Sequence, residues 1–276
     1  MADIISAFVN TPILMRALLV GILVSLCAAL LGVSLVLKRY SMIGDGLSHV
    51  GFGALAIAAV MNWAPMAVAV PVVIAAAFLL LRISGSTSRI KGDSAIALIS
   101  TGALALGVMA VSVSGMNSDL DSYLFGSILA ISESDVVISV ILALLVLVLF
   151  IFFYTKIFAI TFDENFARAT GTKAGAYNML IALLTALTIV IGMRMMGSML
   201  ISSLIIFPAL CSMRVFKSFR AVTVCSAVIS VVTFIAGMVI SYELGTPSGA
   251  SIVCVNILCF AVFTAIGAVM RRNRAG

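Results

Sequence analysis

The chain has 276 residues, of which 63% are hydrophobic and only 9% are charged. A soluble domain carries about 25% charged residues, so this composition excludes a soluble globular protein and predicts one that lies in a lipid bilayer. The formal net charge of +6 comes from basic residues in short connections between apolar runs, and it therefore does not indicate a nucleic-acid partner.

Apolar runs of about 20 residues, long enough to cross the bilayer core as a helix, recur along the chain. The second and seventh runs are the weakest, because glycines interrupt them or a neighbouring run lies close. The sequence predicts an all-α polytopic membrane protein with eight or nine transmembrane helices, including broken helices, in a single transmembrane domain over residues 1–276. The candidate spans are 13–37, 44–61, 63–82, 94–114, 135–157, 175–194, 197–215, 220–241 and 250–270.

The basic residues divide unevenly between the two ends of these spans. If nine spans alternate in direction, nearly all of the 16 Lys and Arg residues fall on one side, and only Arg16 and Arg194 are left over. The positive-inside rule therefore predicts an N-terminus outside the cell and a C-terminus in the cytoplasm. The connections assigned to the cytoplasm are 38–43, 82–93, 156–174, 214–219 and the C-terminal tail.

The second span opens with SMIGDGLSH, which contains Asp45 and His49, the only histidine in the chain. Residues four positions apart lie on one face of a helix. A carboxylate oxygen and an imidazole nitrogen are suitable ligands for Zn²⁺ or Mn²⁺, and ionisable groups within membrane spans usually mark a substrate pathway. Asp45 and His49 are therefore candidate metal ligands, and two-fold symmetry in a homodimer would double their number.

A structural alternative exists for the same pair. Asp45 can cap the N-terminus of a helix near the membrane interface, where the helix dipole favours its charge, while His49 packs against a neighbour. In either case, small residues would allow neighbouring helices to approach closely. These are Gly44, Gly46, Gly51 and Gly53.

The longest connection assigned to the cytoplasm contains TFDENFARATGTKAG, and residues 161–175 are predicted to form a short amphipathic helix. Asp163 can cap its N-terminus, and Gly171 suits a C-terminal stop. A helix with one apolar side and a charged rim fits docking onto a cytoplasmic partner, and a solvated linker is the alternative. The apolar side would consist of Phe162, Phe166 and Ala169.

The seventh span shares features with the second. Aligning SMIGDGLSH with RMMGSMLIS pairs three identical residues, among them Gly44 with Gly197. Under the alternating topology the two segments run in opposite directions, as inverted repeats do. Ser198 and Ser202 then take the positions of the candidate metal ligands. The segment from Ser198 to Pro208 is a candidate second wall of the pathway, and ordinary packing through small residues is the alternative.

The sequence contains none of the common enzyme motifs. GxxxxGK[ST], GxSxG and HExxH are all absent. The longest stretches outside the spans, 115–134 and 156–174, are too short for a nucleotide-binding domain. The chain is therefore expected to move a substrate and not to be an enzyme itself, so any ATP hydrolysis would take place in a separate subunit.

Five segments resemble, in the expected order, the sequence blocks of the integral membrane permeases of ABC-type divalent metal uptake systems. Together they extend from about residue 13 to residue 270. The segments are RYSMIGDGLSHVGFGALAI, KGDSAIALISTGALALGVM, YLFGSIL, MGSMLISSLIIFPAL and LGTPSGASIVCV.

This resemblance implies a homodimeric permease for zinc, manganese or iron in the plasma membrane of a prokaryote. Two cytoplasmic ATPase subunits would drive it, and an extracytoplasmic metal-binding protein would supply the ion. No cofactor is expected to be bound permanently, because the metal is the substrate. A secondary transporter coupled to ions or protons is the alternative function, with Asp45 and His49 as relay groups.

The resemblance also supports three groups of site residues. The candidate metal ligands are Asp45 and His49. The candidate pathway residues are Gly44, Ser48, Ser198, Ser202 and Pro208. The segment from Ala167 to Gly171 resembles the Ala-x-x-x-Gly coupling loops of ABC permeases, so the candidate ATPase-coupling residues are Phe162, Phe166, Ala167 and Gly171.

Overall fold

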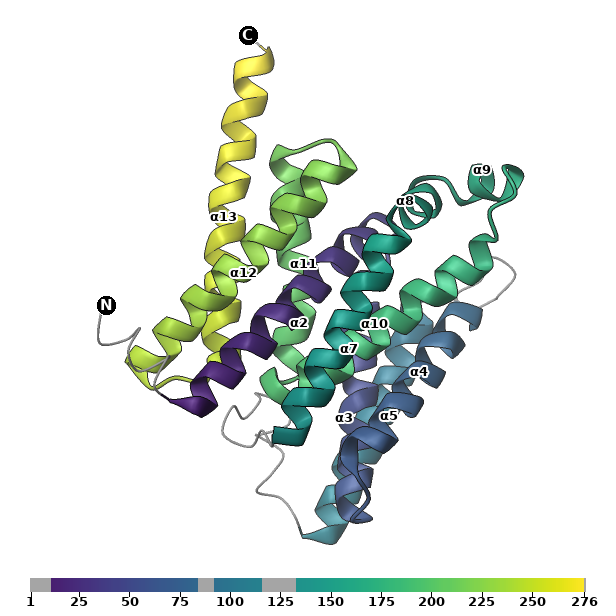
Figure 1. The fold of residues 1–276 in the computed structure, drawn as a ribbon, viewed down its shortest axis with the longest axis vertical. Coiled ribbons are helices and arrows are strands. Elements are labelled where there is room, and N and C mark those ends of the chain that lie inside the picture. The colour runs from purple at the N-terminus through teal and green to yellow at the C-terminus, as the bar shows by residue number, and fades with distance from the viewer. Residues whose placement is uncertain (1–10, 84–91, 116–132, 276) are drawn as a thin grey trace.

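A computed structural model describes residues 11–83, 92–115 and 133–275. Within these ranges the regular structure is entirely helical, and nine helices are long and apolar enough to cross a membrane. The predicted all-α architecture and the count of nine spans are therefore confirmed for the described part of the chain. Figure 1 shows the helices as one tilted bundle, with the C-terminus at its upper end.

The membrane-spanning helices follow the predicted runs closely. They are α2 (Pro12–Leu37), α3 (Ile43–Val60), α4 (Pro65–Ile83), α5 (Gly92–Ser114), α7 (Glu133–Phe152), α10 (Ala174–Met196), α11 (Ser198–Val215), α12 (Phe219–Leu244) and α13 (Ser248–Ala275). Two short helices, α8 (Tyr154–Phe162) and α9 (Glu164–Ala169), connect α7 to α10.

α2 and α3 lie in the interior of the bundle, together with α10. α2 packs against α7, α10, α11 and α12, and α3 packs against α4, α5, α10 and α11. In the most apolar part of α3, 72% of the residues are buried, against 17% in α5. The outer helices keep apolar side chains on their free faces, as helices in contact with lipid do. The candidate metal ligands thus belong to the most buried span.

Glycines set the spacing of the interior helices. A Cβ atom built on Gly32 of α2 would lie 2.0 Å from the carbonyl oxygen of Ile205 in α11. On α3, a Cβ atom at Gly53 would lie 2.5 Å from the carbonyl oxygen of Ala103 in α5. Because these neighbours are backbone atoms, the helices approach more closely than any side chain would allow.

The predicted span 135–157 is wrong at its C-terminal end. The chain interrupts the helix at Phe153, where α7 ends and the separate helix α8 begins. Aromatic rings pack around the break, with Tyr154 against Phe150 and Phe153 against Tyr177. The apolar run continues through this point, so hydropathy alone does not reveal the change of helix.

The predicted amphipathic helix over 161–175 is also wrong in its extent. Phe162 is the last residue of α8, and the following helix, α9, contains only six residues. Asp163 caps α9 as predicted, since its side chain accepts a hydrogen bond of 2.9 Å from the backbone N–H of Phe166. The extended backbone of this capping residue is what divides the predicted helix in two.

The boundary between α10 and α11 lies at Gly197, which has φ 84° and ψ 161°. This region of backbone space is open essentially only to glycine. It allows α10 to end and α11 to begin within one residue, which explains why the sixth and seventh runs are hard to separate in the sequence.

Alternation of the spans places several basic connections at one end of the bundle. In Figure 1, α8, α9, the turn between α11 and α12 and the C-terminal end of α13 all lie toward the top. That this end faces the cytoplasm stays a prediction from the charge distribution. The connections 84–91 and 116–132, on which part of that prediction depends, lie outside the described residues.

Candidate functional site

The candidate metal ligands lie in the first two turns of α3. The N-cap residue of this helix is Met42, and no side chain caps it. Asp45 is therefore the third helical residue, and the alternative in which it caps the helix is wrong. Its carboxylate instead faces His49, with 3.6 Å between Asp45 Oδ2 and His49 Nε2.

Ser202 of α11 is the nearest polar group from another helix. Its Oγ lies 3.4 Å from Asp45 Oδ1, to which it can donate a hydrogen bond, and 3.3 Å from the carbonyl oxygen of Ser198. The sequence alignment pairs the second span with the seventh. In the structure the corresponding helices, α3 and α11, pack against each other. The Asp45 carboxylate thus has polar neighbours from two helices, α3 and α11.

Two other candidate pathway residues point away from this pair. Ser48 is fully buried, and its hydroxyl donates a 2.7 Å hydrogen bond to the carbonyl oxygen of Asp45. Pro208 is buried within α11, which continues as one helix on both sides of it. Both residues are buried within the single chain, and their role in a pathway stays a prediction.

The Asp45–His49 pair opens on one side. The Asp45 side chain is 43% exposed and that of His49 is 26% exposed. His49 Nδ1 is buried without a hydrogen-bond partner. The imidazole therefore places Nε2 beside the carboxylate on the accessible side, where it can act as a ligand in the neutral tautomer protonated at Nδ1.

The separation of the two ligand atoms suits chelation of one ion. Two ligands at about 2.1 Å from a metal, separated by a tetrahedral angle, lie about 3.4 Å apart. The observed 3.6 Å is close to this value, and it is too long for a strong hydrogen bond that would compete with a metal. No group of three or more His, Cys, Asp or Glu side chains able to hold a metal occurs in the described residues.

Tight packing holds α3 in place behind the pair. A Cβ atom on Gly44 would lie 3.0 Å from Ile205 Cδ1 of α11, and one on Gly51 would lie 2.6 Å from Met193 Cε of α10. The ligands are therefore carried on a helix that contacts α10 and α11 closely.

The candidate ATPase-coupling residues lie together at the α8–α9 corner, the stretch from the end of α8 at Phe162 to Gly171. Phe162 and Phe166 are 58% and 66% exposed, whereas Ala167 is buried. Ala169, predicted to share their apolar side, is exposed on the short helix α9. Gly171 follows with φ 82° and reverses the chain toward α10. Two large aromatic side chains therefore project from this corner.

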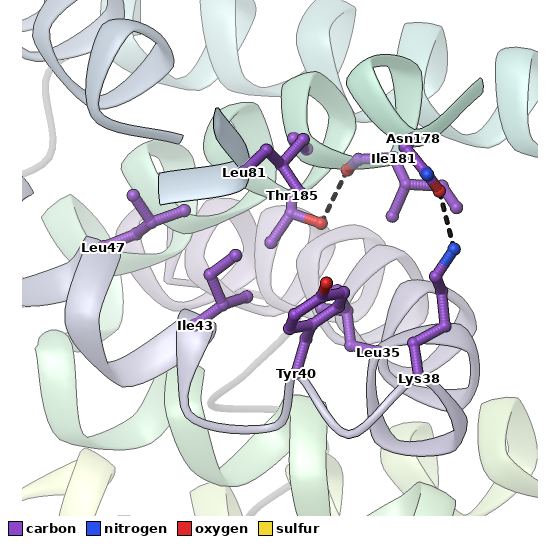
Figure 2. Close-up of a pocket in the computed structure, with 10 residues that line it drawn as sticks. Leu35, Lys38, Tyr40, Ile43, Leu47, Leu81, Asn178, Ile181 and Thr185 are labelled. Atoms are coloured by element: carbon purple, nitrogen blue, oxygen red, sulfur yellow. Dashed lines mark hydrogen bonds between the residues drawn. The ribbon is translucent and has the colours of Figure 1, made fainter. Parts of the chain in front are cut away.

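A polar cluster beside this corner was not predicted from the sequence. Lys38, Glu164 and Asn178 come from the end of α2, from α9 and from α10, and they contact one another. Figure 2 shows Lys38 extending from the end of α2 to Asn178, with Tyr40 to one side. Residues this far apart in the chain share no local spacing pattern, so no signal in a single sequence marks them.

Comparison with known proteins yields consistent matches over almost the whole chain. The model of the ABC 3 transport family matches residues 10–267. The manganese import system permease protein ScaB of Streptococcus gordonii is 30% identical over 249 residues, which cover 90% of this chain and 89% of ScaB. The high-affinity zinc uptake system membrane protein ZnuB of Haemophilus influenzae is 29% identical over 91% of this chain and 96% of its own.

A solved structure is similar as well. PsaBC from Streptococcus pneumoniae, determined in complex with Fab, matches this fold with a TM-score of 0.85 and 28% sequence identity. The match covers 95% of this chain and 94% of the other. The arrangement of helices is therefore similar over almost the whole chain.

Proposed function

The chain belongs to the ABC 3 transport family, and from this premise we propose that it is the membrane subunit of an ATP-driven importer of a divalent transition metal, Mn²⁺ or Zn²⁺. Its relatives include a manganese import permease and a zinc uptake membrane protein. The observation that carries the proposal is the Asp45–His49 pair, with ligand atoms 3.6 Å apart on the accessible side of a buried span. Family membership favours this function over an ion-coupled secondary transporter.

A second copy of the chain completes the metal site in this proposal. One chain supplies two strong ligands, and Ser202 adds a neutral oxygen next to Asp45. A two-fold axis near α3 would bring two carboxylates and two imidazoles to one ion, which is a four-coordinate set suited to Zn²⁺ and acceptable to Mn²⁺. Two carboxylates also neutralise the charge of the ion where water is excluded.

Energy comes from a partner, since the chain contains no phosphate-binding loop. We place the contact with a cytoplasmic ATPase at the α8–α9 corner, where Phe162 and Phe166 project and the charged Arg168 lies beside them. Exposed aromatic side chains with a charged rim are typical of protein interfaces. An extracytoplasmic metal-binding protein would supply the ion at the opposite end of the bundle.

Reconstitution tests the whole proposal. The chain, co-purified with its ATPase and placed in liposomes with the binding protein, is expected to accumulate Mn²⁺ or Zn²⁺ only when ATP is present on the ATPase side. Ca²⁺ and Mg²⁺ should compete poorly, because a carboxylate–imidazole site favours borderline metals over hard cations. Accumulation driven by a proton or sodium gradient without ATP would instead identify a secondary transporter.

A separate variant tests the proposed ATPase contact at the α8–α9 corner. We expect Phe166→Glu to lower the amount of ATPase that co-purifies by at least about tenfold, because it places a charge in the apolar centre of the contact. The side chain is 66% exposed, so the fold should be unaffected. Asn165→Glu is the matched control, since it adds the same charge to an exposed position of the same helix. Equal loss in both variants, or loss in neither, would place the ATPase elsewhere.

A further inference from the structure

Lys38 is a largely buried charged side chain near the α8–α9 corner. Its side chain is 10% exposed. Its ammonium group donates to three acceptors: the carbonyl oxygen of Ile160 at 3.2 Å, Asn178 Oδ1 at 2.6 Å and Glu164 Oε2 at 3.4 Å. An ammonium group has three donors, so Lys38 uses all of them to join the end of α2 to α8, α9 and α10.

Glu164 closes this junction from the side of α9. The same Oε2 atom accepts a 3.0 Å hydrogen bond from Asn178 Nδ2, and Oε1 forms an ion pair with Arg168 on the exposed side of the helix. Burial raises the pKa of the Glu164 carboxyl, but Asn178 and Lys38 outweigh burial and bring the pKa below its usual value. Glu164 thus remains a carboxylate at neutral pH and holds α9 against Lys38.

Lys38 is also the first residue after α2, and the chain turns sharply there into α3. Arg39 has φ 62°, the backbone N–H of Tyr40 donates to Leu35, and the N–H of Ile43 donates to Tyr40. Backbone hydrogen bonds therefore connect this turn both to the end of α2 and to the start of α3. α3 begins at Ile43, only two residues before Asp45.

One small gap lies in the packing beneath the turn. A cavity of about 20 Å³ lies between the turn and α10, lined by Tyr40, Ile43 and Leu47 on one side and by Ile181 and Thr185 on the other. In Figure 2 the lysine stands at the edge of this space and reaches across to Asn178. The polar contact of Lys38 with Asn178 thus links the turn directly to α10, beside the apolar packing.

We propose that Lys38 is a positioning residue that transmits movement of α9 to the metal ligands on α3. In this scheme, which rests on the proposed function, displacement of α9 by the ATPase moves Glu164. Glu164 then pulls Lys38 and the turn, and the turn shifts the first helical residues of α3, including Asp45. The route contains one salt bridge and one short turn. Lys38 does not touch the ion, so its loss affects transport only through coupling.

Metal transported per ATP hydrolysed, measured in liposomes containing the complete complex, tests the proposal. We expect Lys38→Met to keep ATPase association, ATP hydrolysis and equilibrium metal binding, but to lower this ratio by about fivefold, which lies within the range by which residues of a coupling network act. Arg39→Met is the matched control. It removes an exposed positive charge next to Lys38 in the same turn and leaves the Lys38–Glu164 ion pair intact, so the ratio should stay unchanged.

Glu164→Gln provides the second arm, since glutamine can keep the contact with Asn178 while losing the charge that attracts Lys38. The double variant Lys38→Met/Glu164→Gln should have the same ratio as Lys38→Met alone, because both substitutions break the same ion pair. If the complex with Lys38→Met does not assemble, the metal transported per ATP hydrolysed by the Glu164→Gln complex tests the proposal instead. A ratio equal to that of the unmodified complex overturns the role of Lys38. Absence of ATP-driven transport by the unmodified complex would overturn the proposed function instead.

Discussion

The Asp45→Asn variant is expected to lose metal uptake by more than about 100-fold, the upper range for removing a group that merely supports a metal ligand. Asparagine has almost the same shape, and its amide can still meet Ser202, which lies 3.4 Å from Asp45 Oδ1. What it lacks is the negative charge that replaces the hydration of a divalent ion. His49→Ala should cause a similar loss, because it removes the imidazole from the pair.

Uptake of Mn²⁺ and Zn²⁺ into cells or liposomes measures this effect, with membrane insertion and ATPase co-purification measured on the same samples. Ser100→Ala is a suitable control, since the hydroxyl of this buried serine of α5 donates a hydrogen bond to the carbonyl oxygen of Ala97 in its own helix. It should transport normally. If a stable protein lacking both Asp45 and His49 side chains took up metal at the unmodified rate, the pair would have no part in the pathway.

The Gly32→Ala variant is expected to be severely destabilised. The added methyl group would lie 2.0 Å from the carbonyl oxygen of Ile205 and 2.9 Å from its carbonyl carbon. Backbone atoms cannot rotate away, so α2 and α11 must separate along their contact. Overpacking of a core costs about 1–3 kcal/mol and occasionally more, and a clash with backbone should reach or exceed the top of this range.

Thermal unfolding in detergent and the yield of folded protein from membranes measure this destabilisation. Gly102→Ala is the matched control, because no atom lies within 4 Å of a Cβ atom built at that glycine in α5. Removing a helical glycine there should leave stability unchanged or raise it by up to about 1 kcal/mol. A melting temperature for Gly32→Ala equal to that of the Gly102→Ala protein would show that α2 and α11 are not in the described contact.

Local patterns determined the parts of the site that lie within one helix. Asp45 and His49 are four residues apart, and helical geometry alone brings them to one face, where the structure finds them 3.6 Å apart. The cap of α9 by Asp163 was likewise readable from residue type. The separation of α8 from α7 was not, because the apolar run continues through Phe153.

The apolar runs, the connections between them and the spacing of Asp45 and His49 were determined by the sequence itself, because lipid requires each span to satisfy its own backbone hydrogen bonds. The break at Phe153, the contact of Ser202 with Asp45 and the junction of Lys38 with Glu164 were decided only by tertiary structure. Ser202 and Glu164 come from helices far along the chain from α2 and α3. No helical period relates such residues, so only the packing of α8 to α11 around α2 and α3 brings these side chains together.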